Sequence, residues 1–154
     1  MSAKASKKDM EYFATQCASF NFRKATRAVT QLFDNALKPA GLRSTQLVVL
    51  LAAGIYENST MSQLADIVSA DRTTLTRALK PLVLKGYLKY VSGKDKRQTS
   101  VELTDKGHKV ILKSIPYWTK AQNHVIKSLG QKNWENLRIA LDKVGGQVKE
   151  NTLV

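Results

Sequence analysis

The chain has 154 residues, 43% of them hydrophobic and 24% charged, and its formal net charge is +13. This length and composition fit one domain with a hydrophobic core and exclude two full-sized domains or a largely disordered chain. The longest apolar run, residues 47 to 55, is too short to cross a membrane, and no signal peptide is visible. We therefore expect a cytoplasmic protein with no membrane partner.

The N-terminal part is predicted to be a flexible basic arm, residues 1 to 8, followed by one long helix over residues 9 to 38. Apolar residues in the second stretch recur mainly at spacings of three and four, which is typical of an amphipathic helix. Pro39 and Gly41 end it.

Two shorter helices are expected next. The first, about residues 45 to 56, has Ser44 as its predicted N-cap and is predicted to bury the apolar block of residues 47 to 53. Residues 60 to 63 (TMSQ) fit a capping box, which predicts the start of a short third helix at about residues 61 to 68.

A fourth helix, about residues 72 to 84 with Asp71 at its N-cap, divides into an apolar face and a polar face without acidic residues. Short hydroxyl side chains allow close approach to base edges, and arginines can contact guanine or phosphate. The helix pair therefore predicts a helix-turn-helix that binds nucleic acid. The DNA contacts that we predict from it are Ser62, Gln63, Arg72, Thr73, Thr74, Thr76, Arg77 and Lys80.

Residues 86 to 103 are predicted to form a β-hairpin with a long basic tip that contains a glycine. The segment of residues 71 to 100 holds eight basic side chains and two acidic ones. A basic tip at this distance from a recognition helix can enter a minor groove. We therefore add the tip residues Lys94, Asp95, Lys96 and Arg97 to the predicted DNA-binding residues.

The C-terminal part is predicted to be two helices separated by Gly130. Thr104 and Asp105 cap the first, and Pro116 is expected to kink it. The last helix has apolar residues at alternating spacings of three and four, a narrow seam that usually needs a partner helix. The residues of this seam are Trp134, Leu137, Leu141, Val144 and Val148.

Catalytic and cofactor sites are not expected. The sequence offers no paired carboxylates, no Ser/His/Asp set and no glycine-rich phosphate loop at convincing spacing, so we expect neither an enzyme nor a cofactor. His108 and His124 lie too far apart on one predicted helix to share a metal, and the single cysteine, Cys17, excludes a thiolate cage.

Several motifs closely resemble the MarR family of winged helix-turn-helix regulators. The Asp-x-Arg pair of Asp95 and Arg97, followed by Leu-Thr-x-x-Gly at residues 103 to 107, is the most specific of them. The resemblance extends from the first long helix to the last. The matching segments are residues 41 to 46 (GLRSTQ), 71 to 77 (DRTTLTR), 80 to 82 (KPL), 95 to 99 (DKRQT) and 103 to 107 (LTDKG).

The resemblance implies a mainly α fold: a winged helix-turn-helix with a β-hairpin wing, residues 44 to 103, between dimerisation helices at residues 9 to 40 and 104 to 154. It implies a homodimeric, sequence-specific regulator of transcription on pseudo-palindromic double-stranded DNA, in which Arg97 enters the minor groove and Asp95 helps to hold the wing. Repression is the expected mechanism, released by a small aromatic acid or an oxidant, although an activator would have the same sequence features. The residues expected at such an effector pocket are Cys17, Phe33, Leu37, Arg43 and Trp118.

Alternatives remain open at this point. A nonspecific architectural DNA- or RNA-binding protein would also be basic, and a membrane-surface protein would need an exposed apolar helix face beside its cations. Cys17 either fills an apolar helix face or, as in one branch of the MarR family, senses oxidants. Trp118 and Trp134 fit core or dimer contacts better than a ligand site.

Overall fold

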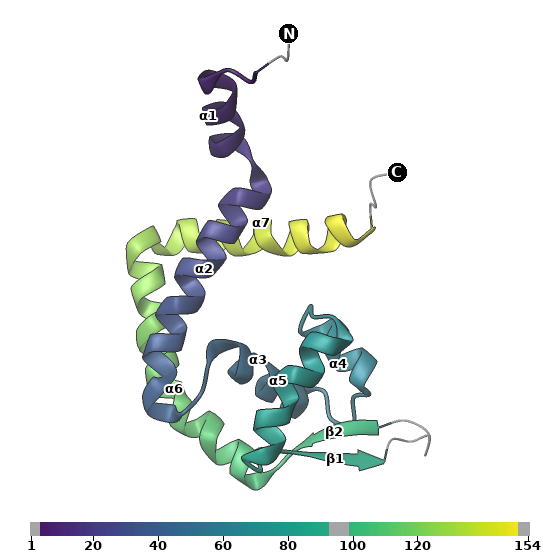
Figure 1. Cartoon of the computed structure of the whole chain (residues 1–154). Helices are drawn as coiled ribbons and strands as arrows, with labels where there is room; N and C mark the ends of the chain where they lie inside the picture. Colours follow the sequence, from purple (N-terminus) through teal and green to yellow (C-terminus); the bar gives the residue numbers. More distant parts are fainter. Residues whose placement is uncertain (1–3, 93–98, 151–154) are drawn as a thin grey trace.

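The computed structural model describes residues 4 to 92 and 99 to 150, with side chains described as far as residue 146. This part of the chain is mainly α-helical and contains one two-stranded antiparallel hairpin (Figure 1). In chain order it forms α1 (Lys7–Gln16), α2 (Ala18–Leu37), the 3-10 turn η1 (Lys38–Ala40), α3 (Ser44–Ile55), α4 (Met61–Ile67), α5 (Arg72–Leu84), β1 (Leu88–Ser92), β2 (Thr99–Leu103), α6 (Asp105–Leu129) and α7 (Gln131–Glu150).

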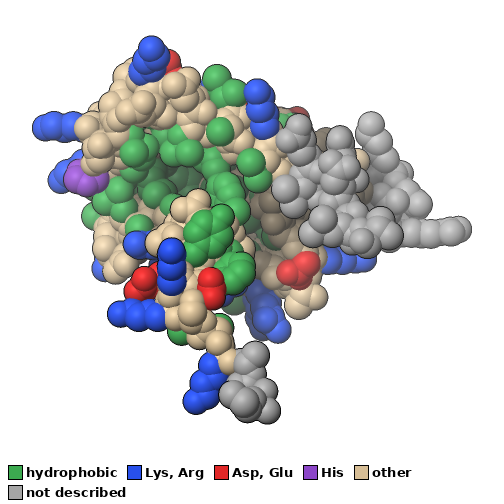
Figure 2. Space-filling model, turned by 90° about the horizontal axis from the view of Figure 1, so that it is seen from above, with side chains coloured by type: hydrophobic (Ala, Val, Ile, Leu, Met, Phe, Trp, Pro, Cys, Tyr) green, Lys and Arg blue, Asp and Glu red, His purple; other side chains and the backbone are tan. Residues whose placement is uncertain are grey.

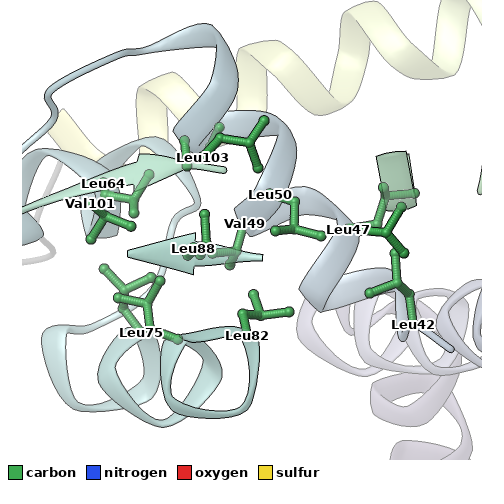
Figure 3. Packing of buried hydrophobic residues seen from close by; sticks show 14 of the residues in the cluster. Leu42, Leu47, Val49, Leu50, Leu64, Leu75, Leu82, Leu88, Val101 and Leu103 are labelled. Atoms are coloured by element: carbon green, nitrogen blue, oxygen red, sulfur yellow. The ribbon is translucent and has the colours of Figure 1, made fainter. Parts of the chain in front are cut away.

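The hydrophobic core joins α3, α4 and α5 to the hairpin and to the start of α6. Leucine side chains from α3, α4, α5 and β1 are almost completely inaccessible to solvent. In Figure 3 the side chains of Leu75 and Leu82 point from α5 toward Leu88 on β1. Because these side chains lose their contact with water together, their burial is the main stabilising contribution to this part of the fold.

The long helix expected over residues 9 to 38 is wrong, because the structure has two helices that meet at Cys17. The backbone of Cys17 is extended, with φ −64° and ψ 111°. The side-chain amide of Asn21 donates to the carbonyls of Thr15 (2.9 Å) and Cys17 (3.1 Å), which replaces helical partners at the break.

The arm expected over residues 1 to 8 is also too long. Helix α1 begins at Lys7, because the Ser6 hydroxyl accepts a hydrogen bond from the backbone N–H of Asp9 at 3.1 Å and so caps the helix.

The start of α3 also differs from the expectation. Arg43 is the N-cap, and Ser44 is the first helical residue. The backbone N–H and the hydroxyl of Ser44 both donate to Asp34 Oδ1, at 2.7 and 2.6 Å, and thereby tie α3 to α2. The apolar block of residues 47 to 53 is not buried throughout, since Val48 is 50% exposed and Leu51 is 38% exposed.

Three expected helix starts and the expected end of α6 are confirmed, whereas α3 and α4 each end one residue earlier than expected, at Ile55 and Ile67. Thr60, Asp71 and Thr104 each cap a helix through a side-chain oxygen, and Gly130 ends α6 with φ 82°. Pro116 lies inside α6, which continues past it and bends along its length in Figure 1.

Helices α1, α2 and α7 and the end of α6 form the part of the molecule away from the hairpin. Helix α2 packs along α6, α7 follows α6, and α1 extends beyond them (Figure 1). Of the predicted seam residues on α7 whose side chains are described, Trp134 is half-buried, and the other three, Leu137, Leu141 and Val144, are exposed. Val148 of the predicted seam lies where side chains are not described.

Candidate nucleic-acid interface

A tight turn sets the angle between α4 and α5. Ser69 has a left-handed backbone conformation, with φ 53°. The backbone N–H of Ser69 donates to Asp66 O at 3.1 Å, and that of Ala70 donates to Ala65 O at 2.9 Å. These bonds close α4 and direct the chain into α5, so the two helices form the expected helix-turn-helix.

Helix α5 buries one face and exposes the other. Leu75, Leu79 and Leu82 are at most 1% exposed and dock the helix on the core. The opposite face is exposed at every position where we predicted a DNA contact. These positions are Arg72, Thr73, Thr74, Thr76, Arg77 and Lys80.

The start of α5 is fixed by Asp71. Its Oδ1 accepts a hydrogen bond from the Thr74 backbone N–H at 2.8 Å, and its Oδ2 accepts one from the Thr74 hydroxyl at 2.6 Å. These two bonds from Thr74 favour the charged carboxylate and hold the pKa of Asp71 below its ordinary value. The carboxylate is therefore ionised at neutral pH and caps the positive end of the helix.

The predicted contacts on α4 are both exposed, but one is already engaged. Gln63 Oε1 accepts hydrogen bonds from the backbone N–H of Thr60 at 2.9 Å and from its hydroxyl at 3.1 Å. Only the amide –NH₂ of Gln63 remains for a phosphate. Ser62 lies beside it on the exposed side of α4.

The hairpin is anchored to the start of α4. Thr60 forms a β-bridge with Ser100, and the Ser100 hydroxyl donates to Asn58 O at 3.2 Å. The backbone N–H of Val101 donates to Ser59 O at 3.3 Å. Our sequence reasoning missed this anchor; its only signal was Asn58, a residue type that tolerates the left-handed conformation observed there.

The predicted tip contacts Lys94, Asp95, Lys96 and Arg97 lie outside the described residues. The described strands pair from Leu88 opposite Leu103 to Ser92 opposite Thr99. The Ser92–Thr99 end of the described strands lies away from the start of α6.

The Leu-Thr-x-x-Gly motif fixes the base of the hairpin. The Thr104 hydroxyl donates to Gly86 O at 2.7 Å and accepts from the Gly107 backbone N–H at 3.1 Å. A Cβ atom at Gly107 would collide with the carbonyl oxygen of Tyr87 and the side chain of Leu103. Only glycine lets α6 approach the hairpin this closely.

The cations of α5 have no acidic partner in the described part of the chain. The ion pairs found there are Lys7–Glu11, Lys89–Glu102 and Arg138–Asp142. Arg72, Arg77 and Lys80 take part in none of them. Their charges remain available to an anionic partner.

The structure does not bring the five expected effector-pocket residues into one cavity of the single chain. Leu37 is completely buried in the core, and Phe33 lines a groove between α2, α6 and α7. Arg43 lines a depression between α2 and the start of α3. In the single chain Cys17 is exposed at the junction of α1 and α2, and Trp118 is exposed on α6.

Within the described ranges, no three His, Cys, Asp or Glu side chains are grouped as metal ligands would be. None of the described helices is both long and apolar enough to cross a membrane.

Comparison with known proteins places this geometry in a family. Residues 31 to 114 match the model of the family described as transcriptional regulator SarA/Rot. The HTH-type transcriptional regulator SarZ of Staphylococcus saprophyticus is 34% identical over 89 residues, which are 57% of this chain. That match spans 61% of SarZ.

Solved structures are similar over most of the chain. The transcriptional regulator MosR of M. tuberculosis is 32% identical, with a TM-score of 0.80 over 90% of this chain and 99% of MosR. A complex of MosR with DNA is 35% identical over 90% of this chain and 100% of the MosR chain, with a TM-score of 0.79. MarR of E. coli bound to operator DNA shares the fold at 23% identity, with a TM-score of 0.77 over 86% of this chain and 96% of that one.

The family match covers the end of α2, α3, the helix-turn-helix, the hairpin and the start of α6. The expected resemblance and the expected winged-helix fold are both confirmed, and the matching family consists of regulators rather than enzymes. The chain therefore belongs to the SarA/Rot family of transcriptional regulators and has the winged helix-turn-helix fold of the MarR group.

Proposed function

We propose that this protein is a regulator of transcription that binds a specific double-stranded DNA sequence as a homodimer in the cytoplasm. The observation that carries the proposal is the exposed face of α5, where hydroxyl groups and unpaired cations replace the acidic residues common on solvated helices. The DNA complex of MosR supports it, because MosR matches this chain over both α5 and the flanking elements.

The proposed DNA-binding residues fall into those that contact base edges and those that contact phosphates. Arg77 and Thr73 lie near the centre of the exposed face, opposite the buried leucines, so we assign them to base edges. Arg72 and Lys80 lie beside them and suit phosphates, as do Ser62 and Gln63. At the hairpin tip we assign Arg97 to the minor groove and Asp95 to holding the wing. Lys94 and Lys96 are assigned to the DNA backbone. These four assignments remain predictions from sequence.

A second copy of the chain is the proposed partner of the helices away from the hairpin. Figure 2 shows hydrophobic side chains gathered in a hollow on the face seen from above. A groove of about 490 Å³ between α2, α6 and α7 accounts for many of them. Helix α1 has no buried residue and exposes Phe13. So much exposed apolar surface at one end is typical of a homodimer interface. Residues that line the groove include Phe22, Val29, Phe33, Val125, Leu137 and Leu141.

We further propose repression by occupancy of the operator and release by a small aromatic acid. Arg27 and Arg43 line the depression between α2 and α3, and Asp34 beside them is held by Ser44. Two guanidinium groups suit a carboxylate.

Benzoate should weaken duplex binding by the wild-type protein and leave duplex binding by the Arg43→Gln variant unchanged. An equal loss of duplex binding in both proteins would exclude this depression as the effector site.

Sequence-specific binding is tested by comparing two arginines. Arg77→Ala should weaken binding to a preferred duplex by about 1 to 3 kcal/mol and relax base preference, because it removes a base contact. Arg138→Ala is the matched control, since Arg138 lies exposed on α7 in an ion pair with Asp142. The two variants carry the same charge. Equal small losses in both, on preferred and scrambled duplexes alike, would favour a nonspecific architectural or RNA-binding protein instead.

A further inference from the structure

The three threonines at the start of α5 differ in whether their hydroxyl group already donates a hydrogen bond to a nearby residue. The Thr74 hydroxyl donates to Asp71 Oδ2 at 2.6 Å, and the Thr76 hydroxyl donates to the carbonyl oxygen of Arg72 at 2.8 Å. The Thr73 hydroxyl has no acceptor among the described residues. Because a hydroxyl group has a single proton, only Thr73 can still donate to a base without breaking a bond within the helix.

The hydrogen bond of Thr76 leaves its methyl group as the part of the side chain that can meet a partner. The hydroxyl donates back to the carbonyl oxygen of Arg72, four residues earlier, as threonine hydroxyls in helices often do. Thr76 is exposed and lies on the side of α5 that carries Arg72 and Lys80, one turn before and one turn after it. Its methyl group is therefore available on this side for an apolar contact.

We propose that Thr76 is a specificity-determining residue that reads the C5 methyl group of a thymine through its own methyl group. Among the four DNA bases, only thymine presents a methyl group in the major groove. The flanking Arg72 and Lys80 contact phosphates and so set the depth at which Thr76 meets the base edge. The inference rests on the proposed function and assigns a base preference to one position of that site.

The test uses the duplex that the wild-type protein enriches from random double-stranded DNA. Each thymine of a half-site is replaced singly by deoxyuridine, which removes only the C5 methyl group, and affinities are measured by fluorescence anisotropy. Wild-type protein should lose about fourfold in affinity at one thymine, equivalent to one methyl group buried. Thr76→Val keeps the methyl group and should show the same loss. Thr76→Ser keeps the hydroxyl and should bind both duplexes equally.

Thr119→Ser is the matched control, because it removes the same methyl group from an exposed threonine of α6, outside the proposed DNA surface, and should leave the deoxyuridine effect unchanged. Circular dichroism checks that each variant is folded. A deoxyuridine effect that persists in Thr76→Ser, or that is absent from the wild-type protein on an enriched sequence, would overturn the inference alone. If no sequence is enriched, the proposed function fails as well, so the two failures are distinguishable.

Discussion

Single residues in this protein show how a small side chain can set the direction of a helix. Ser69 adopts φ 53° in the turn before the recognition helix α5, where glycine would carry no steric penalty. Gly107 allows α6 to lie against the carbonyl of Tyr87. Both residues act through the backbone, and neither contacts the proposed DNA surface directly.

Replacing Ser69 by glycine should stabilise the protein. The left-handed conformation destabilises a residue that has a Cβ by about 1 kcal/mol, and glycine avoids this steric cost. Glycine in turn loses more conformational entropy on folding, which cancels roughly half of the benefit. We therefore expect Ser69→Gly to raise the free energy of unfolding by about 0.5 kcal/mol in urea titrations. Ser62→Gly, inside α4, is the control and should lower it by roughly 0.5 kcal/mol. A loss of stability in Ser69→Gly would contradict the left-handed turn.

At the scale of helices and strands, much of the fold was predictable because its signals are local. The residue types at three N-caps, Thr60, Asp71 and Thr104, predicted where three helices begin. The spacing of apolar residues predicted the two faces of α5. The break at Cys17 was not predictable in this way, because the apolar spacing continues across it and no proline or glycine marks it. Its stabilising contact, from Asn21 back to two carbonyls, depends on a side-chain conformation.

The candidate site, too, was predictable only in part. The exposed α5 residues followed from the helical pattern, whereas the commitment of Thr74 and Thr76 to bonds within the helix depends on side-chain rotamers. The expected effector residues follow from resemblance alone, and the single chain places them apart, with Leu37 in the core and the other four on different grooves or exposed positions. Helical periodicity and cap chemistry carry no information on a pocket that a second subunit would help to enclose.

The attachment of the hairpin to α6 gives a prediction about Gly107. Gly107→Ala places a Cβ against the Tyr87 carbonyl and Leu103, so we expect it to lower the free energy of unfolding by about 1 to 3 kcal/mol. Gly145→Ala is the matched control on α7, where a Cβ meets nothing within 4 Å. That variant should gain about 0.5 to 1 kcal/mol through helix propensity. Chemical denaturation measures both, and a neutral Gly107→Ala would contradict the close packing.

For the whole molecule, the apolar groove and the exposed face of α7 predict a dimer that polar substitution disrupts. Leu137→Asp places a charge in the groove between α2, α6 and α7 and should shift the protein to monomer at micromolar concentration. Ile55→Asp is the control, since Ile55 is 69% exposed on α3, outside that groove. Light scattering coupled to size exclusion gives the masses. Monomeric wild-type protein, or dimers in both variants, would contradict the proposed interface.

The charge of the whole molecule adds affinity without adding specificity. A net charge of +13 attracts any nucleic acid, and this attraction weakens steeply with salt. Sequence preference has to come from the side chains of α5 and from the spacing of two copies of it. Binding strength alone therefore does not separate a regulator from an architectural protein.

The most direct test of sequence-specific recognition is a selection of random double-stranded DNA by the purified protein at about 150 mM salt. We expect enrichment of an inverted repeat whose half-sites are about one helical turn, or roughly 34 Å, apart, because a dimer places two copies of α5 in successive major grooves. Tight binding without any enriched sequence would contradict sequence-specific recognition by α5.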